Sequence, residues 1–123
     1  GGGIRYDGFR SGGGHTTLTL NNTTINNNQA DNAGGGVYHV FGSHSASGST
    51  YSGNITHAGE GGGLFFGAAT TTSNVSITNS TFTANQARKG IVFGTPTANA
   101  DGGGLRFATD LNTLTITNTN FTN

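Results

Sequence analysis

Residues 18–25, 75–82 and 114–121 repeat one pattern of hydrophobic and polar positions, and residues 44–51 are a weaker copy of it. In the three stronger copies two aliphatic residues flank one Thr or Ser, a polar stretch follows, and a large hydrophobic residue ends the copy. Alternation with a period of two predicts strands with one buried face. The predicted core therefore combines the hydrophobic positions of the stronger copies: Leu18, Leu20, Ile25, Val75, Ile77, Phe82, Leu114, Ile116 and Phe121.

Three consecutive glycines followed by a branched aliphatic residue occur four times, at residues 1–4, 34–37, 61–64 and 102–105. Glycine accepts unusual φ values and lets two backbones approach closely, because it has no side chain beyond hydrogen. Each triplet is therefore predicted to form a corner, and the aliphatic residue after it begins a further strand. No helix is predicted after a triplet and no phosphate-loop spacing is present, so a phosphate-binding role is not expected.

Asparagine recurs three positions after a large hydrophobic residue, at Asn28, Asn54 and Asn85. Equivalent asparagines in stacked strands can hydrogen-bond one another as a ladder, since each amide both donates and accepts. We therefore expect a structural amide ladder at this position.

A second set of asparagines falls in the polar stretch inside each stronger copy. Short polar side chains tolerate left-handed backbone angles there and can bond neighbouring backbone groups. The predicted turn residues are Asn22, Asn79 and Asn118.

The glycine triplets alternate in one order with the large hydrophobic residues that have asparagine three positions later, and the intervals between triplets are unequal. This arrangement is typical of stacked equivalent rungs joined by loops of variable length. Three strands for each passage through the pattern predict an all-β parallel β-helix, a solenoid of about four rungs with three short strands per rung. Residues 1–123 are predicted to form one domain. A projecting insertion is predicted at about 88–101, where the copies differ most in length.

Composition narrows the possible functions. The chain has 23 glycines, 8% charged residues, no cysteine and no formal net charge. A neutral chain of low hydrophobicity suits a solenoid, whose thin core needs few apolar residues per rung. Scattered basic residues disfavour nucleic acid as a partner. No apolar stretch approaches the roughly 18 to 20 residues of a membrane-spanning helix.

One four-residue motif consists of a large hydrophobic residue, any two residues and asparagine. This motif alternates with glycine pairs over the whole chain. It reads Phe82-Thr83-Ala84-Asn85 in the third copy, with Tyr51 and Ile25 in the position of Phe82 in earlier copies. This alternation resembles the repeats of chlamydial polymorphic outer-membrane proteins and of the wider secreted right-handed parallel β-helix repeat proteins. The resemblance implies a right-handed β-helix that acts as an extracellular or surface-displayed shaft or adhesin.

The outward position after each glycine corner carries Arg5, Tyr38, Phe65 and Arg106 in successive rungs. Cationic and aromatic side chains in register gain stacking and cation-π contacts, which is a structural role for this strip. The same strip, with its exposed aromatic faces, is the candidate surface for binding a sugar or a protein partner.

A carbohydrate-active enzyme, such as a polysaccharide lyase or a glycoside hydrolase, is the competing hypothesis for a β-helix. Glycoside hydrolysis needs two carboxylates across a groove. Glu60 and Asp101 each precede a glycine triplet, so stacking places them roughly one strand spacing, about 5 Å, apart. That pair also suits calcium, but the pattern supplies no third acid. The histidines show no metal-ligand spacing, so neither catalysis, a metal nor a cofactor is expected.

Asn74 and Asn79 are the candidate glycosylation sites, because each begins an Asn-x-Ser/Thr motif near a predicted surface turn. Asn54 also begins such a motif, but its ladder role is expected to protect it. Ranked hydroxyls on the outward faces raise ice binding as a further possibility, although paired Thr-x-Thr is not sustained in every rung.

The sequence therefore predicts a non-catalytic structural or adhesive β-helix segment located outside the cell or on its surface. We expect its partners to be other copies of itself in a head-to-tail homopolymer, or flanking repeats of a longer chain, with glycans as a further candidate. A carbohydrate-active β-helix or a carbohydrate-binding module is the alternative. Neither a nucleic acid nor a membrane span is expected.

Overall fold

The computed structural model describes residues 1–9, 16–67, 73–92, 95–96, 101–108 and 113–122. In this part of the chain every regular element is a strand. Among the described residues, none forms a helix long and apolar enough to cross a membrane.

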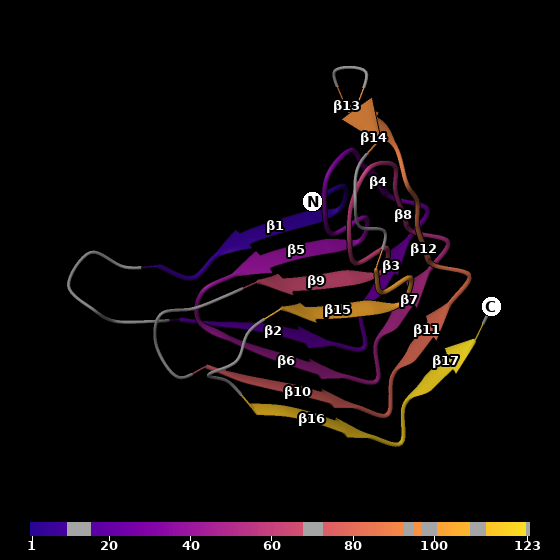
Figure 1. Cartoon of the computed structure of the whole chain (residues 1–123). Helices are drawn as coiled ribbons and strands as arrows, with labels where there is room; N and C mark the ends of the chain where they lie inside the picture. The colour runs from indigo at the N-terminus through magenta and orange to yellow at the C-terminus, as the bar shows by residue number, and fades with distance from the viewer. Residues whose placement is uncertain (10–15, 68–72, 93–94, 97–100, 109–112, 123) are drawn as a thin grey trace.

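Four parallel sheets run side by side along the stack (Figure 1). The first contains β1 (Ile4–Asp7), β5 (Val37–Val40), β9 (Leu64–Gly67) and β15 (Leu105–Ala108). The second contains β2 (Thr17–Asn21), β6 (Ser43–Ser47), β10 (Asn74–Thr78) and β16 (Thr113–Thr117). The third contains β3 (Thr24–Asn26), β7 (Thr50–Ser52), β11 (Thr81–Thr83) and β17 (Asn120–Thr122). The fourth contains β4 (Gln29–Ala30), β8 (Ile55–Thr56) and β12 (Gln86–Ala87).

Each turn of the chain visits these sheets in the same order, and each strand pairs in parallel with its equivalent one turn later. This topology is a parallel β-helix of four rungs, which confirms the fold class predicted from the repeats. The three strands expected in each rung are present. The two-residue strands of the fourth sheet add to them, and they are too short to show any periodicity in the sequence.

Part of the predicted insertion at 88–101 forms a small hairpin. β13 (Ile91–Val92) and β14 (Thr95–Pro96) pair antiparallel, unlike the strands of the rungs. The hairpin stands at the top of the view in Figure 1, apart from the four parallel sheets. Residues 93–94 and 97–100 lie outside the described part of the chain.

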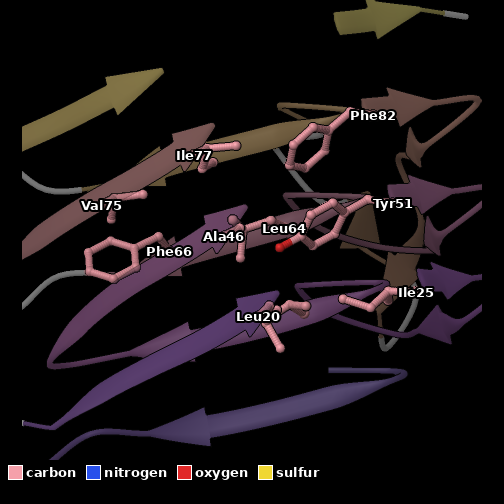
Figure 2. Packing of buried hydrophobic residues seen from close by; sticks show 10 residues of the cluster. Leu20, Ile25, Ala46, Tyr51, Leu64, Phe66, Val75, Ile77 and Phe82 are labelled. Atoms are coloured by element: carbon pink, nitrogen blue, oxygen red, sulfur yellow. The ribbon is translucent and has the colours of Figure 1, made fainter. Parts of the chain in front are cut away.

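Inward side chains of successive rungs form one continuous core, as the alternating pattern predicts (Figure 2). Leu20, Ile25, Val75, Ile77 and Phe82 are buried, and Leu18 and Leu114 pack partly buried against them. In the fourth rung Ile116 remains 41% exposed and Phe121 46% exposed. These two side chains are covered by described residues from the third rung only, which explains their exposure.

Aromatic rings continue through the core from rung to rung. Tyr51 and Phe82 stack with ring centroids 4.3 Å apart and an interplanar angle of 4°. Phe82 and Phe121 stack at 4.8 Å and 14°. Parallel register places equivalent residues directly above one another, so the size and shape of one ring constrain the next.

The glycine triplets are corners, as predicted. Gly61 has φ of 65°, in the left-handed region that side chains disfavour. Gly62 lies in a close backbone contact, since an added Cβ would stand 2.5 Å from the carbonyl oxygens of both Gln86 and Gly103. The middle glycine therefore lets the corner pack against the fourth sheet of its own rung and against the next corner at once.

The predicted turn asparagines also adopt the expected conformation. Asn22, Asn79 and Asn118 have φ values of 48°, 47° and 47°, and Gly48 takes the same place in the second rung with φ of 61°. Asparagine and glycine are the residues that enter this region most readily, so the turn position was identifiable from residue type.

Candidate functional site

The predicted strip runs along the outward face of the first sheet. Backbone pairing places Arg5 opposite Tyr38, Tyr38 opposite Phe65, and Phe65 opposite Arg106. Arg5 is exposed and the other three side chains are half-buried. The structure therefore brings all four candidate residues together on neighbouring strands.

The middle of the strip is an aromatic pair. The rings of Tyr38 and Phe65 stack with centroids 5.3 Å apart and an interplanar angle of 5°. The guanidinium carbon of Arg5 lies 5.2 Å from the centroid of Tyr38, which is within the range of a cation-π contact. These contacts orient both rings and leave them half-exposed on the side of the solenoid.

The far end of the strip is held by an ion pair. The Nε of Arg106 donates to the Oε2 of Glu60 at 3.2 Å, with both side chains partly exposed. An exposed pair of this kind contributes about 0 to 1 kcal/mol. Its main effect is therefore to orient Arg106 and to occupy the carboxylate of Glu60.

Glu60 and Asp101 lie in consecutive rungs. This agrees with the prediction from the sequence, in which each directly precedes a glycine triplet. The amide of Gly34 donates to the carbonyl of Glu60 at 3.0 Å, and the amide of Gly61 donates to that of Asp101 at 2.9 Å. The Glu60 carboxylate is engaged by Arg106. Within the described ranges no three His, Cys, Asp or Glu side chains gather where they could hold a metal ion.

A hollow adjoins the first-rung end of the strip. Its lining includes Arg5 and Tyr38 together with Gln29, Asp31 and His57. The Nε2 of His57 and the Oε1 of Gln29 are hydrogen-bonded at 2.9 Å, which ties the fourth sheet together across two rungs. The hollow thus combines one aromatic face, a guanidinium, a carboxylate and amide groups.

The predicted amide ladder is present, with Asn54 and Asn85 buried and Asn28 half-buried. The Oδ1 of Asn54 accepts from the backbone amide and the Nδ2 of Asn28, at 3.1 and 3.0 Å. The Oδ1 of Asn85 accepts from the same two groups of Asn54, at 3.1 and 2.9 Å. The Nδ2 of Asn54 also donates to the carbonyl of Ile25 at 2.9 Å. Because Asn54 is fully buried, its glycosylation motif is inaccessible in the folded chain.

A second ladder, made of hydroxyls, was not predicted. The amide of Thr23 donates to the Oγ of Ser49 at 3.2 Å, that of Ser49 to the Oγ of Ser80 at 3.2 Å, and that of Ser80 to the Oγ1 of Thr119 at 3.4 Å. Each of these residues directly follows a left-handed turn residue. Their common place after Asn or Gly was the available signal, but Ser and Thr are so frequent here that it does not stand out.

The outward face of the second sheet is uncharged. Register places Ser, Thr or Asn at every outward position of its four strands: Thr17, Thr19, Asn21, Ser43, Ser45, Ser47, Asn74, Ser76, Thr78, Thr113, Thr115 and Thr117. Paired Thr-x-Thr occurs in the first and fourth rungs, whereas the second rung has serine alone. This composition agrees with the expectation that an ice-binding Thr array is not sustained in every rung.

The two candidate glycosylation sites are both exposed but lie in different backbone contexts. Asn74 opens β10 with an exposed side chain. Asn79 lies in the turn after β10 and is also exposed. Both asparagines are therefore accessible as glycan acceptors in the folded chain.

Comparison with known proteins adds no relative: neither a family model, nor a curated protein, nor a solved structure matches the chain.

Proposed function

We propose that this chain is a non-catalytic, extracellular structural and adhesive β-helix segment whose fourth rung stacks on a further rung of the same kind. The observation that carries the proposal is the apolar end of the stack. Ile116 and Phe121 are 41% and 46% exposed, whereas Ile77 and Phe82 in the same columns are 0% and 1% exposed. A further rung would bury both side chains as the fourth rung buries those of the third.

The direction of the hydroxyl ladder supports the same arrangement. In each step the backbone amide of one rung donates to the hydroxyl of the next rung. A first rung placed on the fourth would present the Oγ1 of its Thr23 to the amide of Thr119. The opposite ends of the solenoid would therefore be complementary in hydrogen bonding at this column, which favours open-ended growth.

Charge opposes direct stacking at one point and limits its strength. Arg106 of one copy would face Arg5 of the next, since these residues share the strip. The ion pair between Arg106 and Glu60 offsets part of this repulsion. The partner is either a second copy of this chain or flanking repeats of a longer chain, and both present the same kind of rung.

Stacking of copies is testable with the purified 123-residue chain. We expect its sedimentation coefficient to rise with concentration, and fibres seen by electron microscopy to repeat about every 19 Å, the height of four strand spacings. Replacing both Ile116 and Phe121 with serine should abolish the concentration dependence. Thr115→Ser, which changes the outward residue next to Ile116 on β16, is the matched control. A wild-type chain that stays monomeric at all concentrations contradicts self-stacking and leaves flanking repeats as the partner.

The extracellular part of the proposal rests on the sequence resemblance and on the exposed acceptor Asn74. Glycans are attached to accessible motifs only in a secretory route. We expect material from a glycosylating native source to carry a glycan at Asn74, visible as added mass that Asn74→Gln removes. Intact mass equal to the bare 12.4 kDa chain is the contrary result.

The strip is the proposed adhesive surface, because its stacked rings lie half-exposed along the side of the solenoid. A carbohydrate-binding module is the second candidate function. It is favoured by the hollow beside Tyr38, where an aromatic face adjoins amide and carboxylate groups. Binding of neutral oligosaccharides on a glycan array, lost in Tyr38→Ala, distinguishes this function from a purely structural one.

A further inference from the structure

The second rung differs from the others in the chemistry of its interior. His39 pairs in register with Tyr6 and Phe66, and His44 with Leu18 and Val75. Both histidines are buried, at 0% and 1% exposure. The neighbouring rungs therefore use aromatic and aliphatic side chains where the second rung uses two imidazoles.

The two imidazoles belong to a chain of hydrogen bonds that crosses three sheets. The Nε2 of His39 lies 2.8 Å from the carbonyl oxygen of Phe41, the two Nδ1 atoms lie 3.1 Å apart, and the Nε2 of His44 lies 3.4 Å from the hydroxyl of Tyr51. A carbonyl can only accept, so His39 carries its proton on Nε2. His44 must then donate from Nδ1, and the Tyr51 hydroxyl donates to the Nε2 of His44.

The surroundings of this chain are uncharged. Tyr6 and Phe66 contact the His39 ring from the rungs on either side, each with ring centroids 4.8 Å apart. Tyr6 and Tyr51 are the titratable groups that face the pair, and the hydroxyl of Tyr6 is hydrogen-bonded to the Oγ1 of Thr16. In the described part of the chain no carboxylate faces either imidazole.

Proton uptake is therefore poorly accommodated. One proton can enter at the Nε2 of His44 if the Tyr51 hydroxyl turns from donor to acceptor, and it leaves a positive charge inside the core without a counter-ion. A second proton sets two N–H groups against each other across the 3.1 Å gap between the Nδ1 atoms. Burial accordingly lowers the pKa of His39 to about 4, and burial followed by the proximity of His39 lowers the pKa of His44 to about 3.

We propose that the buried His39–His44 pair makes the second rung an acid-sensitive element of the solenoid, at which proton uptake favours opening of the stack. The pair's contribution to stability is complete only well above pH 6.5, where both imidazoles are neutral in the folded and in the unfolded chain. Below that pH the unfolded chain binds protons that the folded chain excludes. Stability therefore falls as the pH drops from about 6.5 toward the lowered folded-state pKa values.

The chain itself supplies the matched control. The triple variant His39→Phe, His44→Val and Tyr51→Phe gives the second rung, at these three positions, the residues of the third rung, which are Phe66, Val75 and Phe82. Urea unfolding of both proteins is measured from pH 7 to pH 4. Between pH 6 and pH 5 the unfolding equilibrium constant of the wild type should rise about 50-fold relative to the variant, since two histidines are protonated in the unfolded state alone. Equal pH dependence in the two proteins overturns the proposal.

A second measurement holds even if the triple variant does not fold. Nitrogen-15 NMR of the wild-type histidine rings at pH 5 should show two neutral imidazoles, His39 protonated at Nε2 and His44 at Nδ1. An imidazolium signal from either residue in the folded chain at that pH overturns the proposal. Replacing His57, which is exposed, should leave both the ring signals and the urea midpoint difference unchanged.

Discussion

Phe82→Ala should lower the free energy of unfolding by about 3 to 5 kcal/mol, the usual cost of deleting a buried aromatic ring. Phe82 is 1% exposed and stacks on Tyr51 on one side and on Phe121 on the other. The helical stack prevents neighbouring rungs from closing together around the gap, because their spacing is set by backbone hydrogen bonds. Urea unfolding at neutral pH and low protein concentration measures the loss.

Phe121→Ala is the matched control, since it removes the same side chain from the same column at the end of the stack. Phe121 is 46% exposed, so its removal leaves no enclosed cavity. We expect a loss well below that of Phe82→Ala. Equal losses for the two variants would contradict a core whose burial is completed by rungs on both sides.

Asn54→Ala should cost a comparable amount, about 3 to 5 kcal/mol. The variant removes the acceptor for two groups of Asn28 and the donor for Asn85 Oδ1 and for the carbonyl of Ile25. Several buried polar groups then lose a partner, and each unsatisfied group costs about 1 to 3 kcal/mol. Small shifts of the neighbouring strands can relieve part of this cost, so the expected loss of unfolding free energy stays below the sum over all the unsatisfied groups.

Asn26→Ala tests whether the loss comes from the ladder and not from asparagine content. Asn26 is exposed at the end of β3 and makes no side-chain hydrogen bond within the described part of the chain. Its replacement should change the unfolding free energy by less than about 0.5 kcal/mol. If Asn54→Ala is as mild as this control in urea unfolding, the amide ladder is not a stabilising element.

The exposed end and the acid-sensitive rung concern different parts of the solenoid, and their tests are separable. Self-stacking depends on Ile116 and Phe121 in the fourth rung, whereas the acid response depends on two residues buried in the second. A serine variant at the end that no longer associates should keep the same dependence of its urea midpoint on pH. Loss of one property therefore leaves the other intact.

Much of the fold was predictable from residue type alone, because each repeated residue type meets a local requirement of the backbone. Glycine triplets indicate corners, Asn22 and Asn79 indicate left-handed turns, and alternation around Thr19 indicates a strand with one buried face. Aligning these repeated residues also placed Arg5 and Tyr38 in one outward strip and the three ladder asparagines in one column. In a solenoid each repeat stacks on the next, so residues at equivalent positions of the sequence repeat lie next to one another in space.

The tertiary structure alone decided which side chains meet when their partners are not repeated. Glu60 and Arg106 are far apart in the sequence and differ between rungs, so no repeat predicts their ion pair. His39 and His44 showed no ligand spacing, yet the corner at Phe41 and Gly42 turns them toward each other inside the core. Sequence by itself determined the positions that every rung shares, because those follow from local backbone geometry. Contacts peculiar to one rung depend on the distance between strands that only the folded stack sets.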